Sequence, residues 1–215
     1  MSPPVLLIGN KNYSSWSLRP WLLLRHFEVD FEERRLPLDT PQFHAQIKRW
    51  SPARRVPVLI DGEERIWDSL AICETVNERW LSGAAWPRGH GARAHARAVS
   101  CEMHSGFAAM RAEMPMNVRR DPRAVQLSVA AKADCARVFA LWGECLQRSG
   151  GPWLFGQFSI ADAFFAPVAW RFRGYDTAVP ETATPLQDAL LAHPGMQEWE
   201  RAARAEVEHL AQDEL

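Results

Sequence analysis

One stretch decides the fold, and it reads Val56-Pro57-Val58-Leu59-Ile60-Asp61-Gly62-Glu63-Glu64-Arg65-Ile66-Trp67-Asp68-Ser69-Leu70-Ala71-Ile72. Short apolar runs on either side of Asp61-Gly62 predict a hairpin of two strands, at 58–60 and 65–67, because Asp-Gly is a favoured hairpin turn. Asp68-Ser69 then opens a helix at 69–80, since both residue types are preferred N-caps. A strand, a turn, a second strand and a helix with a polar start make a backbone suited to holding a small zwitterion.

The residues before this stretch predict the rest of a first domain. Residues 5–8 form a short apolar run, and a polar loop at 9–15 leads into large apolar residues at helical spacing between Leu18 and Phe27. A second strand is expected at 31–36 and a short helix at 41–50. The predicted order over residues 1–80 is therefore strand, helix, strand, helix, strand, strand, helix.

The residues after position 80 predict a separate, entirely helical domain. Residues 81–91 are rich in Ser, Gly, Ala, Pro and Arg, which is typical of a linker, and residues 92–215 follow it. Apolar residues recur every three or four positions, first in a long helix at about 92–117. Ser159 and Asp162 form a capping box with Asp in place of the usual Glu, which predicts a buried helix to about Trp170. Two further helices are expected at 185–193 and 194–212.

Composition excludes several classes of protein. The chain has 215 residues, 47% of them hydrophobic, which is enough for one large or two modest domains with a real core. The 25 basic and 26 acidic residues give a net charge of -1, so neither nucleic acid nor a membrane is an expected partner. No targeting signal and no membrane-spanning stretch are evident. The four cysteines form no C-x-x-C pair and fall in predicted helices, which favours reduced thiols and a cytoplasmic location.

Pro57 and the Asp68-Ser69 pair each have a structural and a functional interpretation. A proline leading into a strand is typical of an edge or a special turn, where cis geometry is common. A cis bond would leave the Val56 backbone facing outward, where it could pair with an extended peptide. The N-terminus of the helix that opens on Asp68-Ser69 offers free N–H groups and positive potential to a carboxylate, while Asp68 beside it could hold an ammonium. An ordinary edge proline and ordinary helix caps explain the same residues.

The loop before the first helix could activate a thiol. If Ser17 is the N-cap, Pro20 falls at the third helical position, where a missing N–H breaks no helical hydrogen bond. Ser14 and Ser15 would then lie just before the positive end of the helix. A thiol placed there would have a lowered pKa, and a serine hydroxyl could donate a hydrogen bond to its sulfur. A polar turn with serine caps is the alternative.

The order and spacing of these motifs resemble the cytosolic glutathione transferase superfamily, over essentially the whole chain. The resemblance implies an α/β thioredoxin-like N-terminal domain and an all-α C-terminal domain. Ser14-Ser15-Trp16-Ser17-Leu18-Arg19 looks most like the S-S-C-S-W-R motif of the zeta class, although Trp16 stands where that class has cysteine. That departure weakens the implication of zeta-type isomerase activity.

Roles for single residues follow from the resemblance. Ser14, or Ser15 in its place, would stabilise the thiolate of glutathione, which is the co-substrate. The residues that would bind the rest of glutathione are Arg55 near the glycyl carboxylate, Val56 and Pro57 at the cysteinyl backbone, and Asp68 and Ser69 at the γ-glutamyl end. Arg55 could equally be a solvated side chain.

The acceptor site implied by the resemblance lies between the first domain and the predicted helix at 92–117. Met103, His104, Phe107 and Arg111 are its candidate lining residues. His104 and Arg111 lie seven apart on one helical face and could meet an anionic substrate, although an exposed helix face explains them as well. A methionine stripe makes an adaptable apolar wall and is also typical of ordinary core.

The sequence therefore predicts a glutathione transferase that activates the thiolate for attack on a small electrophilic, largely apolar substrate, without a metal. A glutathione-dependent isomerase or peroxidase would use the same residues, and a non-catalytic interaction module is the third alternative. A serine hydrolase is not favoured, because the chain lacks a G-x-S-x-G elbow. The resemblance also implies a homodimer.

Overall fold

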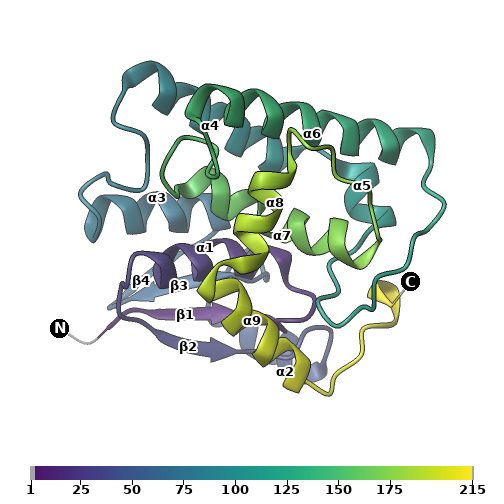
Figure 1. Ribbon diagram of the computed structural model, residues 1–215. Coiled ribbons are helices and arrows are strands. Elements are labelled where there is room, and N and C mark those ends of the chain that lie inside the picture. The colour runs from purple at the N-terminus through teal and green to yellow at the C-terminus, as the bar shows by residue number, and fades with distance from the viewer. Residues whose placement is uncertain (1–2, 215) are drawn as a thin grey trace.

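A computed structural model describes residues 3–214 of the chain. The first domain is a four-stranded mixed sheet in the order β2-β1-β3-β4, in which β1 is parallel to β2 and antiparallel to β3. Its elements are β1 (Val5–Ile8), α1 (Ser15–His26), β2 (Glu32–Arg35), α2 (Pro41–Ile47), β3 (Val58–Asp61), β4 (Glu64–Ile66) and α3 (Ser69–Arg79). This thioredoxin-like order confirms the one predicted from the sequence. Figure 1 shows α1 and α3 between the sheet and the helices α4, α6 and α7 of the second domain, with α2 on the opposite side.

Alternation along β1 divides the first domain into two cores. Successive side chains of a strand point to opposite faces of the sheet. Leu6 and Ile8 accordingly belong to the large core with α1 and α3. Leu7 belongs to a smaller core with Phe43 and Ile47 of α2. Both faces of the sheet are therefore covered.

The second domain consists of helices, as predicted. They are α4 (His90–Ser105), α5 (Ala108–Glu113), α6 (Val129–Ser149), α7 (Ile160–Gly174), α8 (Thr184–Ala192), α9 (Pro194–Ala205) and the 3-10 helix η1 (Ala211–Asp213). The capping box of Ser159 and Asp162 is present at the start of α7, which is buried along almost its whole length. Because α7 packs on both α1 and α4, it joins the two domains. Within residues 3–214, no helix has the length and apolar character needed to cross a membrane.

Three predicted helices break or end earlier than expected. The helix expected at 92–117 breaks into α4 and α5 at Gly106, where a Cβ atom would lie 2.7 Å from the Glu102 carbonyl oxygen. Phe107 follows with a left-handed φ of 60°, which no α-helix contains. The helix expected to reach 212 ends at Ala205, because Glu206 is extended and its side chain bonds to the first domain. The short helix α2 also ends three residues early.

Two histidines pack against each other where the C-terminal end of α1 meets the start of α9. His193 is the N-cap of α9, and its Nδ1 accepts the Gly195 N–H at 3.0 Å. Its Nε2 must therefore carry the proton of the neutral ring, and it lies 2.9 Å from Nδ1 of His26. Burial, with a smaller contribution from His26, lowers the pKa of His193 from 6.5 to about 4. The contact with Gly195 therefore needs a neutral His193 ring, and the contact between the rings needs a neutral His26 as its acceptor.

The stability of the fold should consequently fall in mild acid. His193 has a lower pKa in the folded chain than in the unfolded one, so between about pH 4 and 6.5 the unfolded chain binds more protons and the free energy of unfolding rises with pH. His193→Asn keeps an acceptor for Gly195 but does not titrate. Between pH 7 and pH 4.5 the wild type should lose on the order of 2 kcal/mol more than this variant, as measured by urea denaturation. Parallel pH curves for the two proteins would contradict the assignment.

Candidate functional site

The topology brings three predicted segments to one end of the sheet. Strands β1 and β4 both run antiparallel to β3, so they point the same way, and the helices that follow them, α1 and α3, begin at the same end. Because β3 runs the other way, its first residues also lie at that end, directly after Pro57. The Val56–Pro57 peptide bond is cis, as the sequence predicts. Ser14, Pro57 and Ser69 thus belong to one region of the molecule.

The helix that carries the two serines begins three residues earlier than predicted. Ser14 is the N-cap of α1, Ser15 is its first residue, and the Leu18 N–H donates to the Ser14 carbonyl at 3.2 Å. Pro20 therefore lies inside the helix and removes one of its hydrogen bonds. Ser17 is fully buried on the first turn, where its hydroxyl accepts the Gly9 N–H at 3.2 Å and lies 2.7 Å from the Ser14 hydroxyl.

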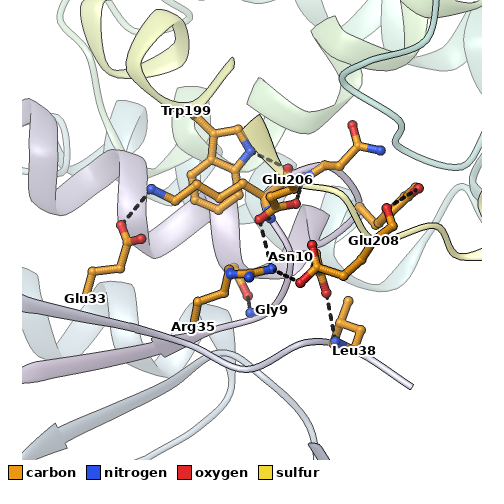
Figure 2. Close-up of polar contacts among 12 residues, drawn as sticks. Gly9, Asn10, Glu33, Arg35, Leu38, Trp199, Glu206 and Glu208 are labelled. Carbon is orange, nitrogen blue, oxygen red and sulfur yellow. Dashed lines mark hydrogen bonds and ion pairs between the residues drawn. The ribbon is translucent and has the colours of Figure 1, made fainter. Parts of the chain in front are cut away.

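The loop before α1 is fixed by the C-terminal part of the chain, as Figure 2 shows. The Glu206 carboxylate accepts the backbone N–H groups of Lys11 at 2.7 Å and Asn12 at 3.0 Å. The Trp199 indole N–H donates to the Lys11 carbonyl at 2.6 Å. Arg119 donates to the carbonyl of Glu206 in turn. These contacts give the backbone of residues 9–14 a defined shape, so the position of Ser14 depends on residues almost two hundred positions later.

The N-terminus of α3 presents one carboxylate and one free hydroxyl. Asp68 is the N-cap, and its Oδ1 accepts the N–H groups of Leu70 at 3.0 Å and Ala71 at 3.4 Å. Its Oδ2 lies 2.9 Å from Nε2 of His104 on α4. Ser69 is fully buried, and its hydroxyl has no hydrogen-bond partner in the part of the chain that the structure describes.

The Trp16 ring packs against two guanidinium groups next to this helix start. The Cζ atoms of Arg19 and Arg111 lie 4.2 Å and 4.8 Å from the centre of its ring, and the edge of His104 contacts it as well. Arg19 is 1% exposed and also lies over Phe164 of α7, at 4.7 Å. Neither arginine forms an ion pair with any residue between 3 and 214.

Burial disfavours the charged, protonated form of the basic side chains in this region. It lowers the pKa of the Arg19 guanidinium well below its usual value, and the charges of Arg111 and Arg171 lower it further. Burial also lowers the pKa of His104, although the neighbouring Asp68 carboxylate opposes that effect. The region between the domains is therefore rich in hydrogen-bond donors and short of negative charge.

The other predicted site residues lie in contrasting surroundings. Val56 is half-buried and Arg55 is exposed. Met103 and Phe107 are buried in the hydrophobic core, so they form the wall behind the site rather than its open surface. His104 and Arg111 lie on separate helices, yet the structure brings them together, because Arg111 donates to the His104 carbonyl at 3.2 Å. Arg19 was missed as a site residue, although an arginine in an apolar helical stripe is a signal that the sequence contains.

The chain is similar to known proteins over both domains. Residues 13–79 match the family model described as Glutathione S-transferase, N-terminal domain, and residues 94–202 match the C-terminal domain, a span of more than half the chain. A probable maleylacetoacetate isomerase of Caenorhabditis elegans is 33% identical over 104 residues, so the chain spans about half of this relative, 48% of each protein being aligned. A Burkholderia glutathione transferase homologue, solved with bound glutathione, has a TM-score of 0.73 at 23% identity over 95% of this chain and 100% of that one. A diazinon-metabolizing glutathione S-transferase of the silkworm Bombyx mori has a TM-score of 0.75 at 16% identity over 94% and 98% of the two chains.

Proposed function

Because the chain belongs to the glutathione S-transferase family, we propose that it binds glutathione and activates the glutathione thiolate for attack on a small electrophilic, largely apolar substrate. Glutathione is a co-substrate in this proposal, and no metal takes part. The Ser14 hydroxyl and the N-terminus of α1 stabilise the thiolate, with Ser15 as the alternative donor. A thiol at a helix N-terminus has its pKa lowered from about 8.5 towards the range of about 3.5 to 7.5, so the thiolate would dominate near neutral pH.

The unpartnered Ser69 hydroxyl is the observation that carries the proposal. A buried hydroxyl without a partner is costly, and a ligand carboxylate at the start of α3 supplies the missing acceptor. Asp68 binds the ammonium group of the γ-glutamyl end, which must replace the His104 imidazole now in contact with it. Val56 pairs with the cysteinyl backbone beside Pro57, and the exposed Arg55 binds the glycyl carboxylate.

A glutathione-dependent isomerase is the second candidate, because the nematode relative is described as a probable maleylacetoacetate isomerase. The same residues of the first domain would bind and activate glutathione in that reaction. The match covers about half of each protein, and Trp16 replaces the cysteine of the zeta-class motif. A peroxidase, or an interaction module without catalysis, fits the same fold.

Calorimetric titration with glutathione tests the proposal. The wild type should bind, and Ser69→Ala should bind about 10- to 100-fold more weakly, because a hydrogen bond to a charged group contributes about 1.5–3 kcal/mol. Ser105→Ala, at an exposed position on α4, is the matched control and should bind like the wild type. If millimolar glutathione gives neither heat nor thermal stabilisation of the wild type, the interaction module becomes the better proposal.

We also propose that two copies of the chain form a homodimer, as the family resemblance implies. Light scattering at micromolar concentration should then give about twice the chain mass of 24.4 kDa. A mass equal to that of one chain would contradict this assembly.

A further inference from the structure

Buried polar groups without partners gather in the region between the two domains. Among the residues that the structure describes, ten buried side-chain nitrogen and oxygen atoms lack a hydrogen-bond partner. Four of the ten belong to three residues connected through Trp16: they are Nε and Nη1 of Arg19, Nε of Arg111 and Nδ1 of His104. A fifth, Oγ of Ser69, lies next to Asp68 and is the group already assigned to glutathione. Such groups are uncommon in native proteins, so their concentration here indicates a ligand site rather than a packing defect.

The chemistry of this cluster points to an anion. A guanidinium group can only donate hydrogen bonds. The carboxylates near it are already used, since Asp68 contacts His104 and Asp134 accepts the Met110 N–H at 3.0 Å. Arg19 therefore lies buried as a charge without a counter-ion, an arrangement that is strongly unfavourable for folding. Proteins retain such costs where function requires them.

We propose that Arg19 and Arg111 bind a carboxylate group of the electrophile, so that the acceptor is a carboxylic acid with an otherwise largely apolar body. This inference rests on the proposed function. A carboxylate matches the planar fork of a guanidinium and accepts two hydrogen bonds from it. The half-buried Trp16 side chain, whose ring contacts both guanidinium groups, provides an apolar surface beside them for the body of the same molecule.

The positions of the two arginines favour the acceptor over glutathione as the source of the carboxylate. Arg111 comes from α5 in the second domain, whereas the residues assigned to glutathione belong to the first. Arg19 lies one turn after Ser15 on the same face of α1, about 6 Å further along the helix axis. An electrophile anchored there by its carboxylate therefore has its reactive carbon near the start of α1, where Ser14 would hold the sulfur.

The matched probes for this site are 4-chloro-3-nitrobenzoate and its neutral amide, 4-chloro-3-nitrobenzamide. In both reactions the thiolate attacks the ring carbon that bears chlorine, a C–S bond forms, and chloride leaves with the electrons of the C–Cl bond. The thiol proton has already been released to solvent when the thiolate forms. The two probes differ only in the group that the arginines would bind, so each enzymatic rate is divided by the uncatalysed rate of the same probe.

The wild type should prefer the benzoate over the amide by about 10-fold or more in corrected kcat/KM, as expected for a charge-assisted hydrogen bond. Arg19→Met and Arg111→Met should each reduce this preference towards unity and leave the Kd for glutathione unchanged. Arg97→Met, at an exposed position on α4, is the control and should keep the preference. Equal rates for the two probes in the wild type, or a preference that survives in Arg19→Met, overturn the proposal. A loss of glutathione binding in Arg19→Met also overturns it, because the arginine then serves glutathione.

A second measurement separates this site from the proposed function, because it requires neither glutathione nor turnover. Millimolar 4-chloro-3-nitrobenzoate should raise the Tm of the wild type and leave the Tm of Arg19→Met unchanged. Without ligand, Arg19→Met should melt about 3 °C or more above the wild type, since it replaces an unpaired buried charge by an apolar chain of similar length. Equal benzoate shifts in the two proteins overturn the carboxylate site even if glutathione binds. A wild type that responds to benzoate but not to glutathione supports the carboxylate site and removes the proposed transferase function.

Discussion

Ser14→Ala should lower kcat by about 100-fold or more while the Kd for glutathione stays within about threefold. The reason is that a hydrogen-bond donor directed at the thiolate sulfur contributes mainly to the reactivity of the thiol and little to the binding of the peptide. Ser14 is the N-cap of α1, but its side chain caps no backbone N–H group among the described residues. Its hydroxyl instead contacts Ser17, whose own hydroxyl accepts from Gly9. Removing the Ser14 oxygen therefore costs the fold little, and the variant should keep the Tm of the wild type.

The pKa of bound glutathione is the measurement that isolates this role. It can be followed through the ultraviolet absorbance of the thiolate, and in Ser14→Ala it should rise towards about 8.5, the value of an unperturbed thiol. Ser17→Ala should give a smaller rise, because Ser17 orients the Ser14 hydroxyl without reaching the sulfur. Ser15→Ala is the matched alternative, one position further along the same helix start. If Ser15→Ala shows the large effects and Ser14→Ala does not, the two serines exchange roles, and if neither variant changes kcat, serine activation of the thiol is wrong.

The parts of the fold that could be predicted are those set by local spacing. The alternation of Leu6, Leu7 and Ile8 is a property of any strand covered on both faces, and Asp61-Gly62 is a turn pair wherever it falls between strands. The capping box at the start of α7 likewise involves only Ser159 and Asp162, three residues apart in the sequence. For the same reason, the order of elements in both domains could be predicted from the sequence.

Helix boundaries could not be predicted where distant residues decide them. The sequence around Glu206 contains no helix-stop signal for the end of α9. The helix ends there because the Glu206 carboxylate binds the backbone N–H groups of Lys11 and Asn12, which are far away in the sequence. The break at Gly106 depends on the left-handed conformation of Phe107, which is rare for a bulky residue and has no sequence signature. Pro20 indicated a later start for α1, yet the helix begins at Ser15. It therefore lacks the one backbone hydrogen bond that the N–H of a residue other than proline would donate at position 20.

The sequence predicts the candidate site residues of the first domain, but not the cluster of side chains between the two domains. Serines at the start of α1 and Asp68-Ser69 at the start of α3 are recognisable because a helix N-terminus has a local pattern. The meeting of Arg19 with Arg111 is different, since it arises only when the second domain brings Arg111 of α5 against Trp16 of α1. Spacing along a predicted continuous helix placed His104 and Arg111 on one face. They do lie together, but on two helices separated by the break at Gly106, and the contact is a hydrogen bond from Arg111 to the His104 backbone. The spacing describes neither feature.

Asp162→Ala should be the most destabilising single substitution outside the site. Its carboxylate is fully buried and accepts three hydrogen bonds, from the N–H of Leu154 at 2.9 Å and from the N–H and hydroxyl of Ser159 at 2.8 Å each. Alanine leaves two backbone N–H groups and a hydroxyl without an acceptor in the core. Each unsatisfied group costs about 1–3 kcal/mol, so we expect a loss of about 3–5 kcal/mol in the free energy of unfolding.

The loss should extend to both domains, because α7 packs on α1 and α4 and its first turn depends on this carboxylate. For a chain of this length, each kcal/mol corresponds to about 2–4 °C, so the Tm should fall by roughly 10 °C. Asp162→Asn, which keeps one acceptor oxygen, should lose less, and Asp188→Ala, at an exposed position on α8, should stay within about 0.5 kcal/mol of the wild type. Denaturant titrations of the three variants, followed by far-ultraviolet circular dichroism, make the comparison. If Asp162→Ala unfolds at the same denaturant concentration as Asp188→Ala, the buried carboxylate does not hold the start of α7, and the link between the domains must rest on apolar packing alone.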